Sequence, residues 1–119
     1  MKNLLFVSSE CVPFIKTGGL ADVVGSLPKC FDKQYYDCRV FLPKYMCMDG
    51  KWKDQLEYVT HFYMDYDGQS RYVGVLKMEY DGVLFYFLDN EYYFSGDKPY
   101  LEHHWDIERF IFFDSSAAV

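Results

Sequence analysis

The segment that most constrains the fold is a strand, a loop and a helix start within the first 24 residues. An apolar run over residues 4–7 ends in small polar residues, a loop follows, and Lys16-Thr17-Gly18-Gly19 opens an amphipathic segment. In α/β proteins this order places the first turn of a helix beside the end of a strand, where unpaired N–H groups and the helix dipole attract anions. The segment therefore predicts an α/β fold with a phosphate site at this turn.

Two glycines and a lysine carry the chemistry of this turn. Because Gly18 and Gly19 have no Cβ, a ligand can approach the backbone closely and a positive φ is open to the chain. Lys16 adds a full positive charge on a mobile side chain. The alternative is a turn whose glycines only permit the bend, with Lys16 solvated beside it. The residues alone leave both interpretations open.

The pattern of apolar residues predicts the elements that follow. Residues 3–9 and 37–42 read as two strands of a parallel sheet, and the first is expected to be buried on both faces. Between them lies a helix with apolar residues at helical spacing, which should end or kink at Pro28. These apolar residues, expected to face the core, are Leu20, Val23, Val24, Leu27 and Phe31. Strand, helix and strand form a βαβ unit.

The middle of the chain predicts an antiparallel excursion. Residues 56–67, 70–80 and 83–88 are rich in β-branched and aromatic residues, and Asp-Gly pairs at 67–68 and 81–82 separate them. Asp-Gly between apolar runs is typical of a type I′ hairpin turn. The last of these strands is expected to return to the main sheet. Residues 44–54 read as a polar, mobile flap, and residues 105–119 as a terminal helix.

Charge and cysteine usage exclude several classes of function. A net charge of −6 disfavours binding of nucleic acid over a broad surface, although one anionic nucleotide could still bind locally. Four irregularly spaced cysteines with no Cys-x-x-Cys pair argue against a zinc ribbon and favour reduced thiols in a cytoplasmic protein. No apolar run reaches the length of a membrane span, and no signal peptide precedes the first strand. His61, His103 and His104 lack acidic or cysteine partners at ligand spacing, so no metal is expected.

Further candidate site residues flank the glycines or follow a strand. Glu10 lies just past the first strand, where open α/β sheets place ligands, and the alternative is a solvated carboxylate. Asp22 lies in the first helical turn, where the helix dipole alone would favour an acid. Tyr92 and Tyr93 follow a strand end, and their rings could stack on sugar or adenine or pack in the core.

Several of these blocks resemble one enzyme family. Residues 16–23 (Lys-Thr-Gly-Gly-Leu-Ala-Asp-Val), 25–28 (Gly-Ser-Leu-Pro), 42–45 (Leu-Pro-Lys-Tyr), 88–94 and 108–113 are similar, in this order, to blocks of bacterial glycogen synthases and plant starch synthases. The resemblance implies a Rossmann-like N-terminal part of a GT-B glycosyltransferase. It also implies transfer of glucose from ADP-glucose to the non-reducing end of an α-1,4-glucan with retention, without a metal or other cofactor. The segment 101–105 departs from the family pattern.

The resemblance also implies roles for individual residues. Glu10 is expected in the catalytic cleft, where it helps to position or polarise the reacting centre. Substrate binding is expected from Lys16, Thr17, Gly18, Gly19, Asp22 and Tyr93. Lys16 and the two glycines are expected to hold the phosphates of the nucleotide sugar and to stabilise charge on the leaving diphosphate.

Family members are several times longer than 119 residues and have two such domains. We therefore expect residues 1–119 to be part of the N-terminal domain, with the second domain absent, and to be inactive alone. Two alternatives remain open: a non-catalytic module that binds a nucleotide or sugar, and a GT-B enzyme with another donor such as UDP-glucose. An isolated fragment would expose an apolar face of its last helix, which predicts self-association.

Overall fold

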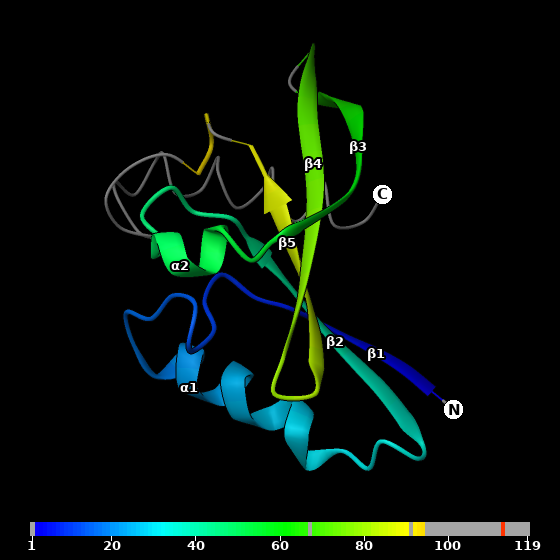
Figure 1. Ribbon diagram of the computed structural model, residues 1–119. Coiled ribbons are helices and arrows are strands. Elements are labelled where there is room, and N and C mark those ends of the chain that lie inside the picture. The colour runs from blue at the N-terminus through cyan, green and yellow to red at the C-terminus, as the bar shows by residue number, and fades with distance from the viewer. Residues whose placement is uncertain (1, 67, 91, 95–112, 114–119) are drawn as a thin grey trace.

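One five-stranded mixed sheet organises the molecule (Figure 1). The computed structural model describes residues 2–66, 68–90, 92–94 and 113. Its elements are β1 (Lys2–Val7), α1 (Gly19–Ser26), the 3₁₀ turn η1 (Leu27–Cys30), β2 (Tyr36–Pro43), α2 (Gly50–Lys53), β3 (Glu57–Tyr66), β4 (Gln69–Tyr80) and β5 (Val83–Asp89). Across the sheet the strands lie in the order β1-β2-β5-β4-β3.

The sheet has a parallel half and an antiparallel half. β1 runs parallel to β2, with Val7 opposite Phe41, and β2 runs parallel to β5, with Pro43 opposite Leu88. β4 pairs antiparallel with both β5 and β3. These pairings confirm the α/β fold and the antiparallel excursion whose last strand returns to the parallel strands. The excursion is continuous with the main sheet.

The turn between β4 and β5 has the backbone that its Asp-Gly pair predicts. Asp81 has φ of 52° and Gly82 has φ of 79°, so both central residues lie in the left-handed region that a type I′ turn requires. At the other turn Gly68 has φ of 73°, while residue 67 lies outside the described residues. The two turns thus set the register of three consecutive strands.

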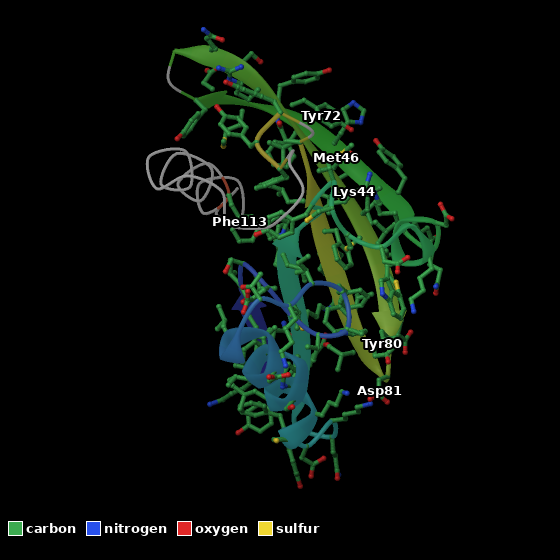
Figure 2. All side chains as sticks on the ribbon, turned by 90° about the vertical axis from the view of Figure 1, so that its left-hand side faces the viewer. Lys44, Met46, Tyr72, Tyr80, Asp81 and Phe113 are labelled. Carbon is green, nitrogen blue, oxygen red and sulfur yellow. The ribbon has the colours of Figure 1, made fainter. Side chains whose placement is uncertain are left out.

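The two faces of the sheet carry separate apolar clusters. Val40 and Leu42 of β2 and Phe85 and Phe87 of β5 pack with Val24 of α1 on one face. The cluster on the other side of the fold consists of Tyr45, Val73, Leu88, Tyr93, Phe94 and Phe113. Phe113, labelled in Figure 2, lies with its ring centroid 5.9 Å from that of Phe41. Alternate residues of the central strands therefore serve opposite clusters.

The buried face of α1 differs from the prediction. Leu20, Val23 and Leu27 are 48%, 56% and 40% exposed, whereas the buried residues of α1 are Ala21, Val24 and Gly25. A small residue at position 25 explains the difference, because it lets the loop before the helix approach its backbone closely. As predicted, the α-helix ends before Pro28, which lies in the first turn of η1.

Two further expectations are corrected by burial. β1 is half-exposed rather than buried on both faces, since Leu5 and Val7 are 53% and 44% exposed on the edge of the described sheet. Residues 44–54 do not form a wholly polar flap, because Tyr45 and Met48 are buried and α2 lies within the segment. Asp49 caps α2 by accepting a hydrogen bond from the backbone of Lys51 at 3.0 Å. The helix expected over residues 105–119 lies outside the described residues, except for Phe113, which is helical.

Candidate functional site

The segment after β1 folds back on itself and onto α1. Ser8 donates its hydroxyl to the carbonyl of Glu10 at 2.9 Å. Cys11 and Ile15 form an isolated antiparallel bridge through two backbone hydrogen bonds of 3.1 and 3.0 Å. The N–H of Val12 then donates to the carbonyl of Ala21 in α1 at 3.1 Å. The loop, residues 8–18, is therefore a closed turn fixed to the helix that follows it.

Glu10 lies at the centre of this loop. Its side chain is buried, with the residue only 2% exposed. Thr17 donates its hydroxyl to Oε2 at 2.5 Å, and the backbone N–H of Ala21 donates to Oε1 at 3.1 Å. Ala21 is the third residue of α1, so its N–H has no partner within the helix. Glu10 thus caps α1 from outside the helix, in place of the solvated position that the alternative interpretation assumed.

The two glycines of the loop do not use the left-handed backbone. Gly18 has an extended backbone with φ of −163°, and Gly19 is the first residue of α1. A Cβ built on Gly19 would meet nothing within 4 Å, and one on Gly18 would meet only Oε1 of Glu10, at 4.0 Å. The bend therefore does not require glycine at either position. Because neither glycine has a side chain, the backbone at the start of α1 is open.

Lys16 and Asp22 form an ion pair across this open backbone. Nζ of Lys16 lies 2.7 Å from Oδ2 of Asp22, and the two side chains are 51% and 55% exposed. Exposed pairs of this kind contribute about 0–1 kcal/mol, because water competes with the contact. An incoming anion could therefore replace Asp22 as the partner of Lys16 at a small cost in free energy.

Tyr45 joins this loop to the end of β5, and sequence reasoning gave it no role in the site. Its ring is fully buried, and its hydroxyl donates to the carbonyl of Ser9 at 2.7 Å. Next to it, the N–H of Met46 donates to the carbonyl of Phe94 at 3.0 Å. Its position could have indicated this role. Tyr45 follows β2, which lies between β1 and β5, and candidate residues follow both of those strands.

The turn after β5 is organised by Asn90. Its Oδ1 accepts the backbone N–H groups of Tyr92 and Tyr93 at 3.0 and 3.1 Å, and its Nδ2 donates to the carbonyl of Tyr72 at 2.8 Å. Tyr93 is 1% exposed and belongs to the apolar cluster, whereas Tyr92 is 55% exposed. The substrate contact of Tyr93 stays a prediction, and its ring is enclosed by other side chains of this chain.

A guanidinium lies beside these two rings. The Cζ atom of Arg71 is 5.6 Å from the ring centroid of Tyr92 and 5.8 Å from that of Tyr93. Its Nε atom is buried and has no hydrogen-bond partner within the described residues. On the same edge of the sheet, Nζ of Lys44 lies 3.9 Å from Oδ2 of Asp89. The carboxyl edge thus carries cations near both β2 and β5.

The structure brings most of the predicted site residues into one place. Glu10, Thr17, Gly18, Gly19 and Ala21 meet at the start of α1, with Lys16 and Asp22 paired on its outer side. Tyr93 stands apart, after β5, and the apolar cluster that contains it meets the loop through Ile15 and Tyr45. In Figure 2, Lys44, Met46 and Tyr72 mark this end of the sheet, and Tyr80 and Asp81 mark the opposite end.

A cavity of about 220 Å³ opens at that opposite end. It is lined by Pro28, Phe31, Lys33, Tyr36, Asp37, Cys38, Gly82 and Val83. Tyr36 begins β2 and Val83 begins β5, so the cavity lies at the amino ends of these parallel strands. Open α/β sheets bind ligands at the carboxyl ends, so the cavity does not mark the anion site.

Burial controls the chemistry of one loop cysteine. Loss of solvent raises the pKa of the Cys11 thiol to about 12, and the nearby Lys29 offsets only part of this effect. None of the four cysteines, which all lie in the described residues, forms a disulfide. Among the described residues, no three His, Cys, Asp or Glu side chains gather as a metal site, and His103 and His104 lie outside that part of the chain.

Of the helices described, none is long and apolar enough to cross a bilayer.

Comparison with known proteins places the chain in a family. The sequence profile described as "Starch synthase catalytic domain" matches residues 3–119. Glycogen synthases of Lachnospira eligens and Lachnoclostridium phytofermentans are 56% and 54% identical to this chain over 117 residues. The alignment covers 98% of this chain and 24% of each of these relatives.

A solved structure has the same fold. The catalytic domain of starch synthase IV from Arabidopsis thaliana, bound to ADP and acarbose, superposes with a TM-score of 0.82 at 25% identity. The match covers 98% of this chain and 24% of that one, so the chain spans about a quarter of the length of its relatives. With the strand, loop and helix geometry described above, the match over residues 3–119 shows that the chain belongs to the starch synthase catalytic domain family.

Proposed function

We propose that this chain is part of the N-terminal domain of a glycogen or starch synthase of the GT-B type. The reaction is transfer of glucose from ADP-glucose to the 4-hydroxyl at the non-reducing end of an α-1,4-glucan, with retention. Relatives named glycogen synthase and a starch synthase structure bound to ADP and acarbose support this assignment. The observation that carries it is the family match over residues 3–119, which includes the whole glycine loop.

The start of α1 is the proposed site for the donor diphosphate. The N–H groups of a first helical turn have no partner within the helix, and Glu10 occupies only that of Ala21. Within the described residues the N–H groups of Gly19 and Leu20 have no backbone partner, and a Cβ on Gly19 would meet nothing within 4 Å, so both N–H groups remain for a ligand. Lys16 would exchange Asp22 for a phosphate oxygen and stabilise the charge that develops on the leaving diphosphate.

In this proposal the other predicted residues position the groups that bind the donor. Thr17 holds Glu10, and Asp22 holds Lys16 beside the open backbone until the donor arrives. Glu10 helps to position the reacting centre. Tyr93 contacts substrate only if the surrounding turn opens, since its ring is enclosed.

The deciding experiment assays the full-length gene product for incorporation of glucose into glycogen, with ADP-glucose and UDP-glucose in parallel. Incorporation from ADP-glucose supports the proposal, and preference for UDP-glucose would replace the donor. Binding of either nucleotide sugar without incorporation would instead favour the alternative, a non-catalytic binding module. The isolated 119-residue chain is expected to show no turnover, because the rest of the family's length lies outside it.

A substitution of Lys16 tests the phosphate contact. In the full-length enzyme, Lys16→Ala is expected to lower kcat/KM for the donor about ten- to a hundredfold, or roughly 1–3 kcal/mol, because a phosphate loses a charge-assisted partner. Lys51→Ala, at an exposed lysine of α2, is the matched control. Equal kinetics for Lys16→Ala and wild type would remove Lys16 from the site.

We also propose a cytoplasmic location and self-association of the isolated chain. The absence of disulfides among the four cysteines, all of them in the described part of the chain, fits a reducing compartment. Leu5 and Val7 leave an apolar, half-exposed strand at the edge of the described sheet, which favours pairing with another copy. Sedimentation at about 100 μM, a concentration that reveals weak contacts, should show dimers or larger species. A clean monomer would contradict self-association.

A further inference from the structure

Glu10 has the properties of a residue that acts through its neighbours. It is 2% exposed, and each of its two carboxylate oxygens accepts a hydrogen bond from the segment at the start of α1. Its backbone is held as well, because Ser8 donates its hydroxyl to the Glu10 carbonyl at 2.9 Å. A group so enclosed is fixed in place on both its main chain and its side chain.

The contacts of Glu10 enclose the two glycines of the proposed donor site. Thr17 precedes Gly18, and Ala21 follows Leu20, so the carboxylate spans the short segment whose backbone would meet the phosphates. Neither glycine needs a special φ for its own conformation. The direction of their N–H groups therefore depends on what holds the two ends of the segment, and Glu10 holds both.

We infer that Glu10 is a positioning residue: its carboxylate joins Thr17 to Ala21 and so fixes the Gly18–Gly19 backbone in the geometry that receives the donor diphosphate. This inference rests on the proposed function and assigns the glutamate a mechanical role. For this role the side chain at position 10 needs two hydrogen-bonding groups, either two acceptors or a donor and an acceptor, that reach Thr17 and Ala21. The role does not require a negative charge. A direct catalytic role would depend on the charge itself.

Reach and charge can be separated by three substitutions in the full-length enzyme. Glu10→Gln removes the charge but keeps the length, because its amide oxygen can accept from Ala21 and its NH₂ can donate to the Thr17 hydroxyl. Glu10→Asp keeps the charge but is one methylene shorter, and Glu10→Ala removes both properties. Glu79→Ala, at an exposed glutamate near the opposite end of the sheet, is the matched control.

The positioning role predicts an order of activities. Glu10→Ala and Glu10→Asp should each lower kcat/KM for ADP-glucose by about tenfold or more, because a small displacement of a binding group costs that much. Glu10→Gln should recover most of this loss. If Glu10→Asp retains activity and Glu10→Gln loses as much as Glu10→Ala, the charge is what matters and the inference is wrong.

A second measurement does not depend on activity. Hydrogen exchange followed on peptides covering residues 16–22 should be about tenfold faster in Glu10→Ala than in wild type, since a buried hydrogen bond to Ala21 is lost. Thr17→Val should accelerate exchange in the same peptides, and the two substitutions together should add little to either alone. Peptides covering α2 serve as the internal control.

The two measurements separate failure of the inference from failure of the proposed function. A full-length product that makes no glucan from ADP-glucose would overturn the function, while faster exchange in Glu10→Ala would still establish the link between Glu10 and α1. Unchanged exchange in residues 16–22 for both Glu10→Ala and Thr17→Val would overturn the positioning role, whatever the activity.

Discussion

Two pairs of glycine residues in this protein, one at the start of α1 and one in the hairpin turns, have different physical roles. At the start of α1, neither Gly18 nor Gly19 has a positive φ, and both have open space where a side chain would stand. In the hairpin turns, Gly68 and Gly82 have φ of 73° and 79°, angles that L side chains rarely adopt. Glycine in the turns is therefore favoured by the backbone angle. Glycine in the loop leaves room for a ligand.

Gly25 has a third role, which is to permit close packing. A Cβ on Gly25 would overlap the side chain of Val12 and lie 3.2 Å from its carbonyl oxygen, so α1 and the loop meet at this point. Gly25→Ala is expected to lower the free energy of unfolding by about 2–3 kcal/mol, the cost of overpacking a rigid contact. Chemical denaturation measures this value. Gly50→Ala, where a Cβ meets nothing within 4 Å, is the control, and equal stabilities for the two variants would contradict the close contact.

The turn glycines should show a cost that follows from backbone angle. Gly82→Ala is expected to destabilise the chain by about 1–2 kcal/mol, because alanine must adopt a positive φ. Gly82→Asn should cost less, since asparagine tolerates this region better than alanine. The same denaturation experiment gives both values. Alanine and asparagine variants of equal stability would mean that strain at φ of 79° is not the cause.

The loop should also resist ionisation of its buried thiol. The unfolded chain ionises Cys11 above its ordinary pKa of 9.0, whereas the folded chain does so only near 12. The unfolded state therefore binds fewer protons between these values, and stability is expected to fall as the pH rises from about 9 to 12. Cys11→Ala, less stable at neutral pH because of the cavity, should show a shallower fall. Parallel pH curves for the two proteins would contradict burial of the thiol.

The loop glycines are expected to have the smallest effect on stability. Gly19→Ala should change the free energy of unfolding by no more than about 0.5 kcal/mol, because it begins a helix and has free space around it. In the full-length enzyme the same variant should weaken donor binding, since its methyl group occupies the approach of the phosphates. Normal donor kinetics in Gly19→Ala would break the comparison, because the open space would then serve no ligand.

The strands and turns were predictable from the sequence because their causes are local. Short apolar runs and the Asp81-Gly82 pair predicted β2, β4 and β5 to within a few residues, and Pro28 predicted the end of α1. Val24 of the predicted face of α1 is buried, and the error at Leu20, Val23 and Leu27 has a different origin. Helical spacing identifies large apolar residues, but the helix packs through Ala21 and Gly25, where small size permits close approach.

The candidate site could be predicted as a group of neighbouring residues, whereas the contacts among these residues could not. The glycines and Lys16 form a contiguous motif, so a sequence pattern can identify them. The buried position of Glu10 depends on the loop folding back so that Thr17 and Ala21 reach it, and the role of Tyr45 depends on where β2 ends relative to β1. Such contacts join segments that no local pattern relates.

The place of β5 in the sheet has a consequence for how the chain folds. It is the last described strand, and yet it lies in the middle, between β2 and β4. β3, β4 and β5 can pair through short-range hairpin contacts, while the pairing of Arg39 with Leu84 must close a long stretch of chain. Loop closure of that kind is the entropically costly, slow part of folding. Pairing of β2 with β5 therefore fixes the register between the two halves of the sheet, and it places the loop before α1 and the turn after β5 at the same edge.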